Sequence, residues 1–333
     1  MQKKVIIFVA KFIFLSKIEL KRGIYLVTVI IILASVIFLV IAATAISMDI
    51  AIVRRKRPVK VHGKMGSESS VDTIFKTNIE EGMNWINSKP FTEHEIKSED
   101  GVKLYGRFYR NNDSKITILM MHGFRSNPIH DFSCAFKFYY DKGFNLLVPD
   151  QRAHGKSDGK YITYGAKERY DAKAWLEYAN TLVEDGELYA TGVSMGASTV
   201  LMATELPLPE NVRGIIADCG FTSPADIIKK VMKEDMKLPL FPLYYTTRAM
   251  SKIIAGFDFE ECNAAIAVKD CKIPLLFLHG KSDSFVPFTM GEEIYNAASG
   301  KKKAVWVEGA DHGCSFLVDR KACADALGGF LGI

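Results

Sequence analysis

Six short apolar runs between residues 116 and 309 constrain the fold of this chain more than any other feature. They read ITILMMHG, FNLLVPD, LYATGVS, RGIIADC, PLLFLHG and KAVWVEG. Their apolar residues are continuous rather than alternating, which is typical of strands buried on both faces of a parallel sheet. Helical stretches such as residues 166–183 and 195–206 separate them. This alternation predicts an α/β fold with a mostly parallel, doubly wound sheet.

Two further segments complete the expected domain. Residues 91–111 contain two alternating runs joined by an Asp-Gly turn at 100–101, which predicts a β-hairpin. The connection over about 221–270 is too long for an ordinary crossover and predicts a small helical cap over a pocket. Its apolar side chains would either line an acyl site or form the core of the cap: Leu238, Leu240, Phe241, Leu243, Tyr244 and Tyr245.

The N-terminal part carries an uncharged apolar run over residues 24–48. A helix of this length exceeds what is needed to cross about 30 Å of hydrocarbon. We therefore predict a membrane anchor in residues 1–53 with a transmembrane helix at about 24–48, although a cleaved signal peptide is an alternative. The shorter run at 5–15 is interrupted by Lys11 and is expected to lie along the membrane surface. We interpret residues 54–70 as a basic, polar linker and residues 71–333 as the main folded domain, which opens with a helix at 71–87.

The distribution of charge indicates a lipid partner. The net charge is +5, and basic residues cluster on both sides of the apolar run. There is no basic stripe interleaved with aromatic residues, so no nucleic-acid partner is expected. Because both flanks are basic, the positive-inside rule does not set the orientation. The short N-terminal arm favours a single-pass protein with an extracytoplasmic catalytic domain; the oligomeric state is not determined.

The six cysteines include no C-x-x-C pair, and their spacing suits neither a zinc site nor a dense disulfide framework. We expect free thiols, with Cys262 and Cys271 as the pair to test for a disulfide. The histidines show no ligand spacing with other histidines or carboxylates. No metal and no cofactor are expected.

The segment GVSMGA at residues 192–197 lies between an expected strand and an expected helix. A G-x-S-x-G pattern in this context is typical of a nucleophile elbow, which exposes a serine hydroxyl in a strained turn. Ser194 is therefore the candidate nucleophile. The backbone N–H of Met195, at the start of the following helix, is a candidate oxyanion donor.

A base and an acid follow along the chain. His312 comes after the last expected strand, and Asp283 follows the strand before it. The order Ser194, Asp283, His312 suits a serine triad in which His312 takes the hydroxyl proton and Asp283 orients the imidazole. Asp218, at the end of another strand, is the rival acid.

These motifs resemble the α/β-hydrolase superfamily over residues 90–333. HGFRSN at 122–127 is similar to the His-Gly-x signature of that superfamily, which implies the backbone N–H of Phe124 as second oxyanion donor. DQRAHGKSDG also resembles the family and implies that Arg152, His154 and Asp158 fix a loop near the pocket. His122 and His279 are expected to be structural. The combination most resembles bacterial membrane-anchored hydrolases related to the serine-aminopeptidase-like and dienelactone-hydrolase-like branches.

Three functions follow, in order of preference. The first is a membrane-anchored serine hydrolase acting on a carboxylic ester or thioester, with a small-molecule acyl ester or lipid-like substrate. The second is a serine exopeptidase of the same fold. Its anionic pocket would come from acids of the cap, which are Glu234, Asp235, Asp258, Glu260 and Glu261. The third is a non-catalytic, membrane-tethered binding module.

Overall fold

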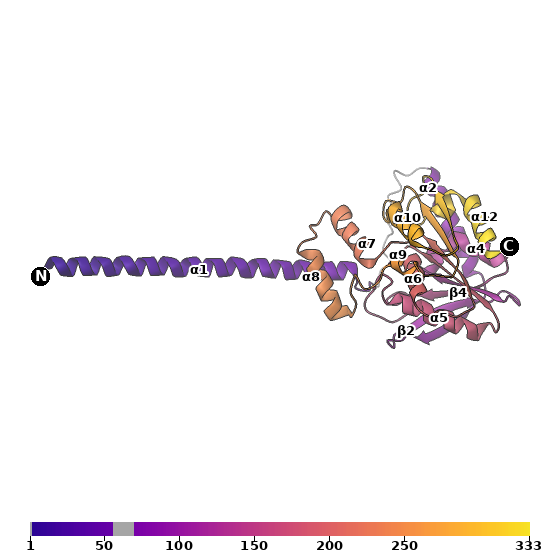
Figure 1. Ribbon diagram of the computed structural model, residues 1–333, viewed down its shortest axis with the longest axis horizontal. Helices are drawn as coiled ribbons and strands as arrows, with labels where there is room; N and C mark the ends of the chain where they lie inside the picture. Colours follow the sequence, from indigo (N-terminus) through magenta and orange to yellow (C-terminus); the bar gives the residue numbers. More distant parts are fainter. Residues whose placement is uncertain (1, 56–69) are drawn as a thin grey trace.

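The computed structural model describes residues 2–55 and 70–333, which form a long N-terminal helix and an α/β domain (Figure 1). The eight strands of the domain are β1 Thr92–Lys97, β2 Lys103–Tyr109, β3 Ile116–Met121, β4 Asn145–Asp150, β5 Glu187–Val193, β6 Val212–Asp218, β7 Leu275–Gly280 and β8 Lys302–Val307. They make one sheet in the order β1-β2-β4-β3-β5-β6-β7-β8. The pairs β1–β2 and β2–β4 are antiparallel, and all other pairs are parallel. The predicted mostly parallel sheet and the β1–β2 hairpin are confirmed.

The helices of the domain are α2 Ser70–Asn87, α3 Pro128–Asp131, α4 Ser133–Asp141, α5 Glu168–Leu182, α6 Met195–Met202, α7 Pro224–Lys230, α8 Leu243–Met250, α9 Ala264–Ala267, α10 Phe288–Ala297, α11 Ser315–Val318 and α12 Arg320–Leu331. They cover both faces of the sheet, except for α7 and α8, which lie toward α1 (Figure 1). Short turns extend three of them: η1 Ala203–Glu205, η2 Val231–Asp235 and η3 Ser251–Ala255. One buried cluster centres on α5 and α6 and includes Trp175 and Leu201. The other lies under α4 and α12 and includes Phe136 and Leu327. Burial on both faces explains why the strand sequences are continuously apolar.

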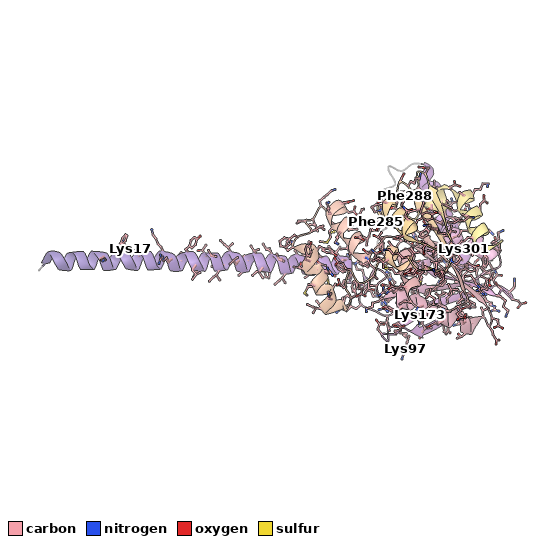
Figure 2. All side chains as sticks on the ribbon, in the orientation of Figure 1. Lys17, Lys97, Lys173, Phe285, Phe288 and Lys301 are labelled. Atoms are coloured by element: carbon pink, nitrogen blue, oxygen red, sulfur yellow. The ribbon has the colours of Figure 1, made fainter. Side chains whose placement is uncertain are left out.

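Helix α1, Gln2–Ala51, projects away from the domain (Figure 1). In the described part of the chain it is the one helix long and apolar enough to cross a membrane, over Ile24–Ala51. The described side chains in the half of α1 far from the domain, such as that of Lys17, contact no other element (Figure 2). Residues 5–15 belong to this same continuous helix, and their expected place along a membrane surface stays a prediction. Lys11 interrupts the hydropathy, but lysine is a good helix former and leaves the backbone hydrogen bonds intact.

The last turns of α1 pack into the domain. Ile52 is fully buried, and its carbonyl accepts a hydrogen bond from the N–H of Ile162 at 2.7 Å. Tyr164 Oη donates to the carbonyl of Ala51 at 2.9 Å, and Thr44 Oγ1 lies 2.7 Å from Thr246 Oγ1 of α8. The guanidinium of Arg54 donates to two carbonyls of the 155–157 loop. The C-terminal end of α1 is therefore tied to the domain, while residues 56–69 of the expected linker lie outside the described residues.

The segment from α7 to η3, residues 224–255, is called the cap below. It lies beside the end of α1, and α8 crosses that helix (Figure 1). Of the cap side chains singled out in the sequence, Leu243 and Tyr244 are buried in the main core, and Leu238 and Leu240 pack against it. Phe241 and Tyr245 are neither buried in this core nor packed against it, since they are 78% and 58% exposed.

The contact between α1 and the domain can be tested by truncating one buried side chain. We expect Ile52→Ala to lower the free energy of unfolding of the domain by about 2–5 kcal/mol, because it opens a cavity at a fully buried position. Thermal and urea unfolding of the detergent-solubilised full chain, followed by tryptophan fluorescence, measures this loss. The matched control is Ile46→Ala, one and a half turns earlier on α1, where the side chain is 60% exposed. Equal stability of the two variants would contradict the packing.

Candidate active site

Ser194 occupies a strained turn between β5 and α6. Its backbone has φ +55° and ψ −117°, a conformation that L-residues rarely adopt. The N–H of Ser194 donates to the carbonyl of Asp218 at 2.9 Å, which fixes the turn against the end of β6. Ser194 is thus held at the carboxyl edge of the sheet, where side chains from several strand ends meet.

Two glycines permit this turn because neighbouring backbones leave no room for a side chain. A Cβ atom on Gly192 would lie 2.2 Å from the backbone carbonyl carbon of Gly196. A Cβ atom on Gly196 would lie 1.8 Å from the carbonyl oxygen of Met121 at the end of β3. The G-x-S-x-G pattern is therefore required by steric contact in this chain.

A continuous chain of hydrogen bonds leads from Ser194 through His312 to Asp283. Ser194 Oγ lies 2.9 Å from His312 Nε2, and His312 Nδ1 lies 2.8 Å from Asp283 Oδ2. An ionised carboxylate can only accept, so Nδ1 carries a proton and Nε2 of the neutral ring is free to accept the serine proton. The three residues come from the ends of β5, β7 and β8, as their order in the sequence predicts.

The environment of Asp283 favours its ionised form. Burial alone would raise the pKa of this carboxyl, but hydrogen bonds from His279 and His312 outweigh it, and the pKa lies below its ordinary value. The backbone N–H groups of Phe285 and Val286 donate to Oδ1 at 3.0 and 2.8 Å. The carboxylate is therefore charged at neutral pH and held in one orientation.

Sequence reasoning gave no role at the site to two aromatic neighbours of Asp283. His279 Nε2 lies 3.3 Å from Asp283 Oδ2 and also contacts the carbonyl of Val286. The ring of Phe285 packs edge-on against His312 at a centroid distance of 5.1 Å. Phe285 lies on the side of the domain next to the cap, where Lys230 lies over its ring (Figure 2). Lys230 also donates to the carbonyl of Ser284 at 2.9 Å, so the cap contacts the Asp283 loop directly.

The rival acid Asp218 is buried beside this chain of hydrogen bonds. Its Oδ1 accepts from Ser315 Oγ at 3.1 Å, and it makes no hydrogen bond to His312 among the described residues. Burial raises the pKa of Asp218 to about 6, although His279 and the hydrogen bond from Ser315 lower it. The geometry therefore pairs His312 with Asp283.

The two expected oxyanion donors flank Ser194. Over residues 2–55 and 70–333, neither the backbone N–H of Phe124 nor that of Met195 donates to a protein acceptor. Gly123, in the same turn as Phe124, lies close to the nucleophile, since a Cβ atom there would lie 3.2 Å from Asp131 Oδ2 and 3.4 Å from Ser194 Cβ. Asp131, which sequence reasoning missed, accepts from the N–H of Gly123 at 2.7 Å and fixes this turn. Its only sequence signal is its place at the end of a helix opened by Asn127 and Pro128.

The remaining histidines of the motifs hold backbone in place. His122 Nε2 accepts from the N–H of Gln151, and its Nδ1 donates to the carbonyl of Gly123. His154 Nε2 accepts from the N–H of Arg125 at 2.9 Å, and burial lowers the pKa of His154 to about 3. Arg152 forms ion pairs with Asp171 and Asp100. The main chain of Asp158 bonds to Ala153 and Lys103, which closes the loop.

Arg125 connects the turn beside Phe124 to the anchor helix. Its Nη2 donates to the carbonyls of Asp49 and Val53, at 3.2 and 3.0 Å. The ring of Phe124 stacks on that of Tyr164 at 5.0 Å, and Tyr164 donates to Ala51 at the end of α1. The oxyanion turn is therefore held between the His154 ring and the C-terminal end of α1.

One group of possible metal ligands occurs among the described residues, formed by Cys219, Asp283 and His312 within 4.8 Å. Burial raises the pKa of the Cys219 thiol well above its ordinary value, which disfavours the thiolate that a metal requires. Asp283 and His312 are already bonded to each other. We assign no metal to this group. All six cysteines, Cys262 and Cys271 included, are free in the structure.

Known proteins similar to this chain share its fold. The family model described as "alpha/beta hydrolase fold" matches residues 116–247. An uncharacterised Bacillus subtilis protein, YqkD, is 27% identical over 71% of this chain and 77% of its own length. The bem46 protein of Schizosaccharomyces pombe is 25% identical over 67% of each chain. The solved structure of the Pyrococcus furiosus esterase Pf2001 is 25% identical, with a TM-score of 0.63 over 84% of this chain and 97% of the esterase.

The steric requirement at the elbow predicts opposite effects for two helical glycines. Gly196→Ala should destabilise the domain strongly, by about 3 kcal/mol or more, because the new Cβ atom meets backbone at 1.8 Å. Gly329→Ala in α12, where the nearest atom is the Nζ of Lys303 at 3.7 Å, should raise stability by about 0.5–1 kcal/mol. Thermal unfolding of both variants measures the contrast. A stable Gly196→Ala protein would refute the close contact at this turn.

Proposed function

Because the chain belongs to the α/β-hydrolase superfamily, we propose that it is a membrane-anchored serine hydrolase that cleaves a carboxylic ester or thioester. The hydrogen-bonded order Ser194, His312, Asp283, with distances of 2.9 and 2.8 Å, carries this proposal. It is the arrangement of nucleophile, base and orienting acid that acyl transfer requires. The similarity to a Pyrococcus furiosus esterase supports ester substrates.

In the proposed reaction, Ser194 Oγ attacks the acyl carbon while its proton passes to His312 Nε2. The electrons of the C=O double bond move to the oxygen, which becomes an oxyanion. When the tetrahedral intermediate collapses, the bond to the leaving alcohol or thiol breaks, and the leaving group takes the proton from His312. Water then attacks the acyl-enzyme and gives a proton to His312. The acid is released as Ser194 regains its proton.

Two features of the protein lower the barrier of this reaction. The N–H groups of Phe124 and Met195 have no protein acceptor in the described ranges and would bind the oxyanion, a contribution of about 10²–10³ in rate per donor. Asp283, kept ionised by its hydrogen bonds, stabilises the imidazolium that forms on His312. Both groups are ordered before substrate binds, so little reorganisation is needed during the reaction.

The acids of the cap region support an ester substrate over a peptide with a free amine. An exopeptidase needs an unpaired anionic group to bind that amine. Asp258 and Glu260 are ion-paired with Arg248, and Asp235 is ion-paired with Lys230. Glu261 accepts from the N–H of Asp258. Of the five candidate acids, four are therefore engaged within the protein. Higher turnover of amino-acid anilides than of para-nitrophenyl acyl esters would favour the exopeptidase instead.

We also propose that α1 crosses the membrane once and that the catalytic domain is extracytoplasmic. The apolar length of Ile24–Ala51 and the exposure of most of its large apolar side chains support a membrane span. Protease treatment of intact cells should remove the domain and leave α1 in the membrane. Digestion only after the membrane is opened would place the domain on the cytoplasmic side.

The nucleophile can be tested by covalent labelling. A fluorophosphonate probe should label the wild-type protein at Ser194, and Ser194→Ala should lose both labelling and hydrolysis of para-nitrophenyl butyrate, by about 10³-fold or more. Mass spectrometry of the labelled peptide identifies the site. Ser198, one turn further along α6 and buried, provides the control variant Ser198→Ala, which should still be labelled. Retained hydrolysis in Ser194→Ala would exclude the mechanism.

The acid can be identified by comparing two substitutions. Asp283→Asn should lower kcat by about 10⁴-fold, because the amide favours the wrong tautomer of His312. Asp218→Asn should stay within about tenfold of wild type, since the side chain of Asp218 accepts a hydrogen bond from only one described side chain, that of Ser315, and its pKa of about 6 already admits a neutral form. Steady-state kinetics at pH 7.5 separates the two. The reverse pattern would assign the acid to Asp218.

A further inference from the structure

The position of the cap along α1 can be related to the thickness of a membrane. An α-helix rises about 1.5 Å per residue, so about 20 residues cross 30 Å of hydrocarbon. The uncharged part of α1 begins at Ile24, directly after Lys21, Arg22 and Gly23. Counting from Ile24, the crossing is complete near Ala43. The next residue, Thr44, is the one whose hydroxyl bonds to Thr246 of α8. The cap therefore lies where α1 leaves the hydrocarbon.

The surface of the cap at this level is apolar. Five of its large apolar side chains are between 40% and 79% exposed, which are Met236, Phe241, Tyr245, Ile253 and Ile254. Single exposed apolar residues are common on soluble proteins, but here five occur within twenty residues beside a predicted membrane span. The rings of Phe241 and Tyr245 lie 6.2 Å apart, and large aromatic side chains are typical of the membrane interface.

The charge of the same segment complements lipid headgroups. Residues 229–252 contain six basic and two acidic residues. Among the described residues, Lys233 and Lys237 are exposed and take part in no ion pair. Basic residues that flank exposed apolar side chains are the pattern of a surface that binds anionic membranes.

Buried apolar side chains extend from the cap toward Ser194. Leu243 of α8 belongs to the same buried cluster as Met48 and Ile52 of α1 and Met195 of the elbow. The rings of Phe124, Tyr164 and Phe221 follow one another at 5.0 and 6.4 Å within this cluster. The side chains between the cap and the nucleophile are therefore largely apolar.

We propose that the exposed apolar face of the cap, formed by Met236, Phe241, Tyr245, Ile253 and Ile254, is seated in the headgroup region of the membrane that α1 crosses. The substrate is then an acyl lipid of that membrane, presented to Ser194 at the side of the domain that carries the cap. This substrate class rests on the proposed serine hydrolase function. The occupant of the surface is the bilayer itself, because the surface is continuous with the membrane span at Thr44 and Thr246.

Photocrosslinking tests the position of the cap without using activity. Benzoylphenylalanine is placed at residue 241 of the full chain, which is reconstituted in vesicles of phosphatidylcholine and phosphatidylglycerol. The control position is Ile333, which is 49% exposed at the end of the molecule opposite α1 (Figure 1). After irradiation, mass spectrometry should find lipid adducts at 241 and few at 333. Equal lipid labelling, or crosslinks from 241 to a second protein chain, would overturn the proposal.

Activity measurements test the substrate class. The double variant Phe241→Ser/Ile253→Ser should hydrolyse a long-chain acyl ester in vesicles about tenfold more slowly, because two side chains lose their membrane contact. Its rate on soluble para-nitrophenyl butyrate should stay within about twofold of wild type, since neither residue contacts Ser194 or its partners. The matched control is Val318→Ser/Ile333→Ser, which removes two exposed apolar residues outside the cap and should change neither rate.

The outcomes separate this inference from the proposed function. An unchanged rate on vesicles, or equal losses on both substrates, would overturn the membrane route, because the cap would then be dispensable or would only shape the pocket. Absence of hydrolysis and of fluorophosphonate labelling in the wild-type protein would instead overturn the serine hydrolase. In that case, the crosslinking result would still decide whether the cap contacts lipid.

Discussion

The close contact between α6 and the end of β3 is the constraint on which the rest of the site depends. Only glycine at 196 lets the helix start lie against the carbonyl of Met121, and only glycine at 192 lets β5 turn beneath it. This approach forces Ser194 into a positive φ, at a typical cost of about 1–3 kcal/mol. The strain is offset by the buried packing of α6, all of whose residues lie in the interior. As a result, the turn between β5 and α6 places the hydroxyl of Ser194 and the N–H of Met195 next to the turn that contains Gly123.

A second set of contacts holds the opposite side of the site, and it comes from outside the hydrolase domain as the sequence delimits it. Arg125 bonds to the last carbonyls of α1, and His154 fixes the N–H of the same residue. A guanidinium at the carbonyl end of a helix also interacts favourably with the helix dipole. The turn that carries the N–H of Phe124 is therefore positioned by the end of α1, the helix that we propose to cross the membrane. The C-terminal end of α1 is part of the scaffold of the candidate active site.

The sheet, the hairpin and the identity of Ser194, Asp283 and His312 as neighbours could be predicted because each leaves a local pattern. Continuous apolar runs mark the strands, and polar residues directly after strands meet at one edge of a parallel sheet. The bonds of Arg125 to Asp49 and Val53 could not be predicted, because they join a side chain to backbone carbonyls about 70 residues away and any sequence supplies carbonyls. The continuity of α1 was missed for a related reason. Hydropathy reports the environment of side chains, whereas helix continuity depends on backbone hydrogen bonds that Lys11 does not disturb.

The attachment of α1 to both the cap and the oxyanion turn has a consequence for how the protein samples its substrates. A flexible tether would hold a catalytic domain near the membrane but let it take every orientation, and only a fraction of encounters would be productive. Here Thr44, Ile52 and Arg54 join the span to the domain without an intervening flexible segment. In the proposed membrane-anchored protein, the depth of Ser194 relative to the bilayer is set by the length of the apolar helix. For the proposed lipid substrates, selectivity would follow from the depth of their ester bonds as much as from the shape of the pocket.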